Sequence, residues 1–93
     1  MARLCNAMGN PIRFGILTML NEGVCNVNEL VLRLNLEQSK VSKHLAVLLR
    51  AELIKYTVDG RRRCYELTSP KLVGRILALF QELNYNSQTP KSP

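Results

Sequence analysis

Residues 34–54, LNLEQSKVSKHLAVLLRAELI, restrict the possible folds of this chain more than any other segment. The apolar residues of this segment recur at helical spacing, on one face of an α-helix: Val41, Leu45 and Leu48. The opposite face presents hydroxyl and basic groups: Ser39, Lys43 and Arg50. A helix that packs into a core on one side and presents such groups on the other can enter the major groove of DNA.

The remaining helices are predicted from apolar periodicity and from capping residues. We expect helices over residues 2–8, 11–21, 27–34 and 38–51. Asn10 and Asn26 precede two of them as N-caps, and Glu29 is expected to complete a capping box with Asn26. Gly23 ends the second helix, and a tight turn over 35–37 joins the last two.

After residue 53 the apolar period changes from helical to alternating. Ile54, Tyr56 and Val58 alternate with polar residues, as in a strand with one buried face. Asp59-Gly60 is predicted to form a two-residue hairpin turn, with the returning strand over 61–67. One face of that strand is expected to hold Arg63, Tyr65 and Leu67.

A final helix is predicted over residues 70–83. Its apolar residues cover more than one face, whereas an ordinary surface helix has a single apolar stripe. The extra width predicts packing against a second subunit as well as against the chain's own core. Residues 1–85 are therefore expected to form one domain, and the polar, proline-containing segment 86–93 a disordered tail.

The charge of the chain favours a polyanionic partner. Thirteen Lys and Arg stand against seven Asp and Glu, giving a formal net charge of +6. Most of the excess lies in residues 38–65, and nucleic acid is the usual partner; a membrane surface or solubility alone are the alternatives. The absence of a long apolar run and of a signal peptide predicts a cytoplasmic protein that does not associate with membranes.

Three cysteines, Cys5, Cys25 and Cys64, are an odd number without CxxC or Cys/His spacing, so no disulfide framework or metal site is predicted. Such cysteines are most often small packed side chains. The alternative is a thiol sensor for an oxidant, reactive sulfur or a soft ion such as arsenite. The chain shows no nucleotide-binding loop and no arrangement of catalytic residues, so we predict no enzymatic activity and no cofactor.

The predicted order of helix, helix, helix-turn-helix, basic hairpin and helix is that of a winged helix-turn-helix, a mainly α fold with a small β-hairpin. Three segments resemble motifs of the ArsR/SmtB family of bacterial repressors. AMGNPIRFGILTML resembles the family's second helix, LNLEQSKVSKHLAVLLRAELI its recognition segment, and DGRRRCYEL its wing. The resemblance covers about residues 4–80.

The resemblance implies a homodimer that binds double-stranded DNA. The residues that it places at DNA are Gln38, Ser39, Lys40, Ser42, Lys43 and His44 on the recognition helix, with Arg61, Arg62 and Arg63 on the wing. For His44 a packed neutral imidazole is the alternative to a phosphate contact. The family's dimer interface uses the first and last helices, which implies Leu4, Leu72, Ile76, Leu79, Phe80 and Leu83.

Two departures from the family pattern bear on regulation. CNVNEL stands where many members have Cys-x-Cys-Asp, and the last helix has no His, so both familiar metal sites are missing. Glu52 replaces the glycine that commonly follows the recognition helix, which predicts a residue at positive φ or a different turn. We therefore expect a repressor on a palindromic operator, released by an unidentified small inducer. The alternatives are a winged-helix protein-interaction module and a DNA-binding protein without an effector.

Overall fold

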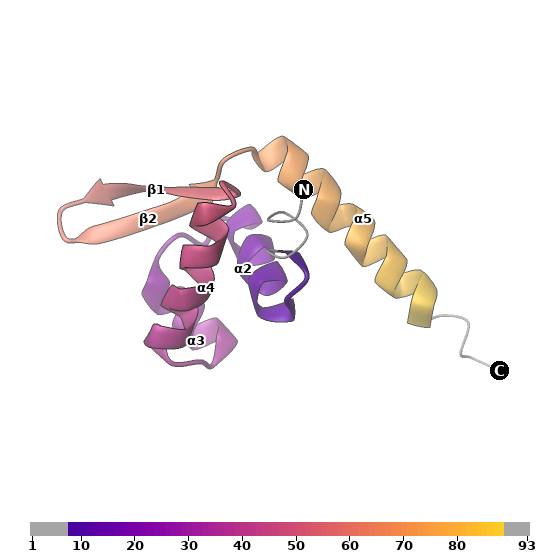
Figure 1. Ribbon diagram of the computed structural model, residues 1–93, viewed down its shortest axis with the longest axis horizontal. Helices are drawn as coiled ribbons and strands as arrows, with labels where there is room; N and C mark the ends of the chain where they lie inside the picture. The colour runs from indigo at the N-terminus through magenta and orange to yellow at the C-terminus, as the bar shows by residue number, and fades with distance from the viewer. Residues whose placement is uncertain (1–7, 89–93) are drawn as a thin grey trace.

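A computed structural model describes residues 8–88 of the chain, with side chains as far as residue 83. The described part contains four helices and one hairpin: α2 (Pro11–Asn21), α3 (Val27–Leu34), α4 (Gln38–Arg50), β1 (Ile54–Asp59), β2 (Arg62–Leu67) and α5 (Pro70–Gln88) (Figure 1). This order is that of a winged helix-turn-helix. The helix predicted over 2–8 lies outside the described residues apart from its last residue, and so do Leu4 and Cys5.

Helices α2 and α3 begin and end at the predicted residues, and asparagine side chains cap their first turns. Asn10 Oδ1 accepts a hydrogen bond from the Ile12 amide at 2.8 Å, and Asn26 Oδ1 accepts one from the Glu29 amide at 2.8 Å. The predicted capping box is only half formed. The Glu29 carboxylate instead pairs with Arg33 Nη2 at 2.9 Å, one helical turn later on the exposed side of α3.

The core lies where α2, α3 and α4 meet the base of the hairpin and the first half of α5. Its members are almost fully buried aliphatic side chains and one tyrosine, and they come from every element. They include Ile16, Leu17, Leu30, Val41, Leu45, Leu48, Ile54, Tyr65, Leu67, Val73 and Leu77. Leu36, in the turn before α4, packs partly against this core, so the apolar face of α4 is held while its other face stays in solvent.

The connection from α4 to the wing uses a left-handed residue. Helix α4 ends at Arg50, one residue earlier than predicted, with Ala51 as its C-cap, and Glu52 follows with φ 61°. A non-glycine residue in this region costs of order 1 kcal/mol. Thr68, just after β2, bonds to this turn: its hydroxyl donates to the carbonyl oxygen of Glu52 at 2.7 Å, and its amide donates to that of Leu53 at 3.0 Å.

The hairpin turn lies one residue later than predicted. Asp59 pairs with Arg62 across the hairpin, so the turn residues are Gly60 and Arg61, and β2 starts at Arg62. Gly60 has φ 65°, whereas Arg61 is not among the positive-φ residues. Glycine at the first central position is the pattern of a type II′ turn, which matches the right-handed twist of paired strands. Tyr65 and Leu67 share the buried face of β2, as predicted.

Helix α5 is longer than predicted. It continues past Leu83 to Gln88 and so includes three residues of the segment for which we expected disorder. Glycine and proline are absent between Gly74 and Pro90, so no helix-breaking residue stands at the expected end. The second half of α5 extends away from the other helices (Figure 1). None of the helices in the described part is long and apolar enough to cross a bilayer.

Candidate nucleic-acid interface

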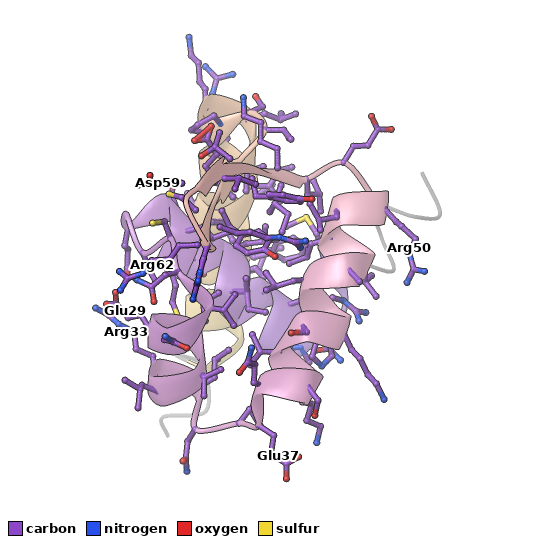
Figure 2. The ribbon with its side chains drawn as sticks, turned by 90° about the vertical axis from the view of Figure 1, so that its left-hand side faces the viewer. Glu29, Arg33, Glu37, Arg50, Asp59 and Arg62 are labelled. Atoms are coloured by element: carbon purple, nitrogen blue, oxygen red, sulfur yellow. The ribbon has the colours of Figure 1, made fainter. Side chains whose placement is uncertain are left out.

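The solvent face of α4 has the composition predicted for it. Ser39, Lys43 and Arg50 are exposed, and the small side chain of Ala46 lies between them. At the N-terminal end of the helix, Glu37 makes no capping bond with its side chain, and it points away from the domain (Figure 2). The first amide groups of α4 are therefore not occupied by their own cap residue and are directed at solvent.

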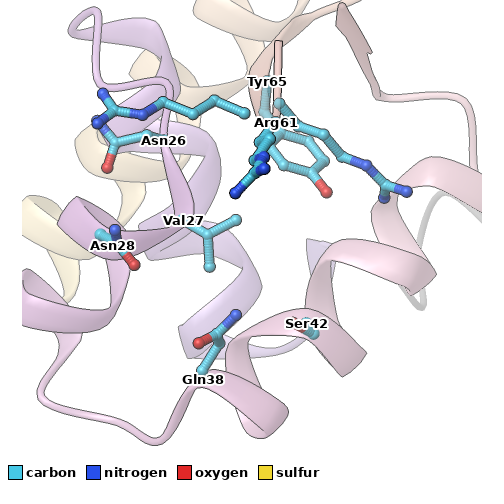
Figure 3. Close-up of a pocket in the computed structure, with 9 residues that line it drawn as sticks. Asn26, Val27, Asn28, Gln38, Ser42, Arg61 and Tyr65 are labelled. Atoms are coloured by element: carbon cyan, nitrogen blue, oxygen red, sulfur yellow. The ribbon is translucent and has the colours of Figure 1, made fainter. Parts of the chain in front are cut away.

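A groove separates this helix from the wing (Figure 3). It encloses about 410 Å³ and is lined by nine residues from α3, α4 and the hairpin: Asn26, Val27, Asn28, Gln38, Ser42, Arg61, Arg62, Arg63 and Tyr65. Arg61 and Tyr65 lie on the wing side of the groove, opposite Gln38 and Ser42 on α4. The structure thus brings five predicted DNA contacts together: Gln38, Ser42, Arg61, Arg62 and Arg63.

The groove is strongly positive. Three arginines line it, and none of its nine described lining residues carries a carboxylate. The first residues of α3 and α4 also face it, and a helix N-terminus attracts anions through its free amide groups and its dipole. Arginine binds phosphate through two parallel N–H donors, and the amide of Gln38 and hydroxyl of Ser42 can bond base edges. The groove therefore fits a nucleic-acid backbone on the wing side and bases on the α4 side.

Arg63 is held in place by two tyrosines. Its Cζ atom lies 4.4 Å from the centre of the Tyr56 ring, and that ring is 5.4 Å from the ring of Tyr65. A hydrogen bond with Tyr65, followed by the proximity of Tyr56, raises the pKa of Arg63 further above its usual value. Tyr56 was not predicted as part of the site. The signal was available, because Tyr56 and Arg63 are diagonal neighbours across the hairpin register.

His44 lies on the other side of α4, facing α2. Its Nδ1 atom is 3.3 Å from Nη1 of Arg13, which can only donate, so Nδ1 accepts and the neutral imidazole carries its proton on Nε2. Burial, then Arg13 and Lys40, lower the pKa of His44 below 6.5. In the protein without DNA, these contacts favour the neutral imidazole. Its Nε2–H group can still donate to a phosphate. Arg13 was not predicted as part of the DNA-binding site, although it lies within the segment AMGNPIRFGILTML.

The remaining DNA-facing candidates are outside the groove. Ser39, Lys40 and Lys43 are exposed on α4 and do not line it. They form the outer side of the helix, between the wing flank and the His44 flank.

Helix α5 presents an uncovered apolar surface. Leu72, Leu79 and Leu83 are 57%, 60% and 57% exposed. Phe80 is 38% exposed and meets the ring of Phe14 edge-on at 5.5 Å, whereas Ile76 packs partly against the chain's own core. Most of the predicted interface residues are therefore exposed in the single chain.

Two of the three cysteines, Cys25 and Cys64, lie within the described residues. Cys25 and Cys64 are free and half-buried, and the backbone next to Cys64 is close to Cys25, because the Tyr65 amide donates to the Cys25 carbonyl oxygen at 2.8 Å. Among the described residues, no group of three or more His, Cys, Asp or Glu side chains could hold a metal ion.

Comparison with known proteins matches this geometry to a family. Residues 10–56 match the model of the bacterial regulatory protein arsR family. The chain is 37% identical over 81 residues to the HTH-type transcriptional regulator CmtR of Mycobacterium tuberculosis, covering 87% of this chain and 69% of CmtR. It is 38% identical over 78 residues to the transcriptional activator HlyU of Vibrio cholerae, covering 84% of this chain and 72% of HlyU.

Solved structures agree with these relatives. HlyU of Vibrio cholerae superimposes with a TM-score of 0.78 at 36% identity, covering 88% of each chain. The homodimeric winged helix-turn-helix DNA-binding domain of Mb0332 from Mycobacterium bovis gives a TM-score of 0.82 at 25% identity, covering 94% of this chain and 80% of that one. These matches confirm the resemblance seen in the three sequence motifs and the prediction that the chain is not an enzyme. The chain belongs to the arsR family of bacterial regulatory proteins and is a DNA-binding transcription regulator with a winged helix-turn-helix.

Proposed function

We propose that this protein is a cytoplasmic homodimeric repressor that binds a palindromic operator and is released by a small inducer. The observation that supports DNA binding most directly is the groove in which three wing arginines face Gln38 and Ser42 of α4. Phosphate is the ligand that arginines and helix N-termini share, and the exposed polar side chains of α4 reach the bases.

In the proposed complex, α4 lies in the major groove and the wing follows the adjacent backbone or minor groove. Gln38 and Ser42 read base edges, while Lys40 and Lys43 neutralise phosphates on the outer side of the helix. His44 donates its Nε2–H to a phosphate, with Arg13 fixing the ring by its bond to Nδ1. Contacts are thus distributed over three sides of one helix.

The proposed dimer forms through α5. Four apolar side chains exposed along this helix are a surface that a second copy would cover, and the related Mb0332 domain is described as homodimeric. A two-fold axis through α5 places one α4 on each side of it. The two recognition helices then meet half-sites about 34–36 Å apart, one turn of DNA, on an operator with matching symmetry.

Activation is a second candidate for the sign of regulation, because the related HlyU is named a transcriptional activator. The same DNA-binding surface serves either outcome, since the position of the operator relative to the promoter determines whether polymerase is blocked. Transcription in vitro from a promoter that carries the selected operator separates them. Repression requires fewer transcripts when the protein is added.

Selection of bound sequences from a random duplex pool tests the proposal as a whole. We expect an imperfect palindrome, and a steep fall of affinity with salt because several phosphates are neutralised. Enrichment of a single non-repeated site would contradict the dimer. Absence of detectable binding at about 50 mM salt would contradict DNA binding and favour a protein-interaction module.

A further inference from the structure

Cys25 and Cys64 form a close pair although 39 positions separate them in the sequence. The amide of Tyr65, next to Cys64, donates a hydrogen bond of 2.8 Å to the carbonyl oxygen of Cys25. Covalent geometry then keeps the two Cα atoms within roughly 8 Å of each other. Cys25 is also close enough to Cys64 to raise the pKa of its thiol. Disulfides join cysteines whose Cα atoms are about 4.4–6.8 Å apart, so this pair can be bridged with small local movements.

The pair lies at a corner of the DNA-binding groove. Cys25 precedes Asn26, the cap of α3, and Cys64 stands between Arg63 and Tyr65 on β2. Asn26, Arg63 and Tyr65 all line the groove. A covalent bond between the two cysteines would therefore shift the loop before α3 and strand β2, which both line the groove.

We infer that Cys25 and Cys64 are an oxidisable dithiol whose disulfide ties the base of the wing to the loop before α3 and weakens DNA binding. The DNA part of this inference rests on the proposed function. The direction follows from geometry: the bond requires the two sulfur atoms to approach to about 2.05 Å. That closure draws the Asn26 and Arg63 segments together and displaces groove donors whose bonds weaken beyond about 3.2 Å.

A hydroperoxide is the class of oxidant that fits two half-buried thiols at the surface. In the first step one thiol reacts with hydrogen peroxide to give a sulfenic acid and water. In the second, the other sulfur attacks the sulfenic sulfur, forming the S–S bond and releasing a second water. Either cysteine can take the first step. Proximity to Cys25, more than burial, raises the pKa of the Cys64 thiol.

The test uses the full chain with Cys5→Ser, which removes the third thiol. After treatment with hydrogen peroxide, we expect loss of two alkylatable thiols, a mass decrease of about 2 Da, and a peptide linking Cys25 to Cys64 within one chain. Cys64→Ser and Cys25→Ser in the same background should each leave a sulfenic acid on the remaining thiol and form no bond within the chain. Thermal melting of each variant checks that it folds.

DNA binding is measured on the same samples with the selected operator. We expect oxidation to lower affinity at least about fivefold, dithiothreitol to restore it, and both serine variants to bind without response to peroxide. Intact thiols after treatment, links only between chains, or a disulfide that leaves affinity within about twofold would overturn the inference. Reduced protein that binds no duplex contradicts the proposed function instead, and the thiol and mass measurements are independent of that result.

Discussion

The DNA-facing surface and the outer face of α5 are both exposed, but only the first has polar side chains that water solvates well. The groove between α4 and the wing is lined by amides, hydroxyls and arginines, which water solvates well. The face of α5 is lined by leucines and a phenylalanine that are 38–60% exposed. Apolar side chains gathered on one face lower the free energy only when something covers them. We therefore propose that the first surface binds a ligand for function and that the second is covered by a partner.

The largest effect is expected from substitutions that disrupt the apolar face of α5 and leave the DNA-binding groove unchanged. Replacing Leu79 and Leu83 with glutamate places two like charges in the proposed dimer interface, so the dimer should dissociate. A monomer engages one half-site only, and operator affinity should fall by at least about 100-fold. Sedimentation and gel-shift titration measure the two quantities. Gln81→Glu, exposed on the same helix, is the matched control. A variant that remains dimeric would show that α5 is not the interface.

The next effect concerns the charge of the groove. Arg61→Ala with Arg62→Ala removes two cations from each chain and four from the proposed dimer, so the log–log salt slope should become shallower by up to about 3.6 if each neutralises one phosphate. Affinity at low salt should fall about tenfold to 100-fold for all sequences alike. Lys55→Ala is the control, because Lys55 pairs with Glu66 at 3.5 Å on the hairpin and does not line the groove. Equal slopes for the two variants would remove the wing arginines from the interface.

A smaller and more selective effect is expected at Gln38. Its amide is proposed to contact a base edge, so Gln38→Ala should cost about 1–3 kcal/mol on the selected operator and relax preference at one position of each half-site. Repeating the sequence selection with the variant measures this change. Lys43→Ala should instead weaken binding uniformly. If Gln38→Ala keeps the full sequence preference, base reading lies elsewhere on α4.

The smallest effect concerns the contribution to folding stability of His44, the least exposed of the predicted DNA contacts. Because its pKa in the folded state is lowered from 6.5, the unfolded state binds the proton more readily. The free energy of unfolding should therefore rise with pH across the interval from the folded pKa to just above 6.5, and level off at higher pH.

Urea unfolding of the wild-type protein and of His44→Gln checks this sign. His44 is the only histidine in the chain, so the difference between the two curves isolates one imidazole. The variant should lack the rise that levels off just above pH 6.5. Parallel curves would mean that burial, Arg13 and Lys40 do not lower the pKa of the ring.

Local signals predicted most of the fold correctly. The starts of α2 and α3 follow from Asn10 and Asn26, whose side chains bond to amides two or three residues later. The positive φ of Glu52 could be predicted as one of two alternatives, because the resemblance placed a glycine there. The end of α5 could not be predicted well, since no helix-breaking residue precedes Pro90.

The candidate site was less predictable because it depends on contacts distant in the sequence. Arg13 and His44 are 31 positions apart, and the pattern of neither helix shows that they meet. Cys25 and Cys64 meet only because a loop hydrogen-bonds to the outer edge of β2. The hairpin turn shifted by one residue because both Asp-Gly and Gly-X can form two-residue turns, and strand pairing decided between them.

The described sheet has only two strands, and this has a consequence for solubility. A short ribbon leaves edge amides and carbonyls unpaired, and such edges can template aggregation between chains. Lysine and arginine side chains along the hairpin, at positions 55 and 61–63, make approach by an identical strand electrostatically unfavourable. The wing charges proposed to meet phosphate thus also act as gatekeepers against aggregation, and variants that neutralise them need to be watched for precipitation as well as for lost affinity.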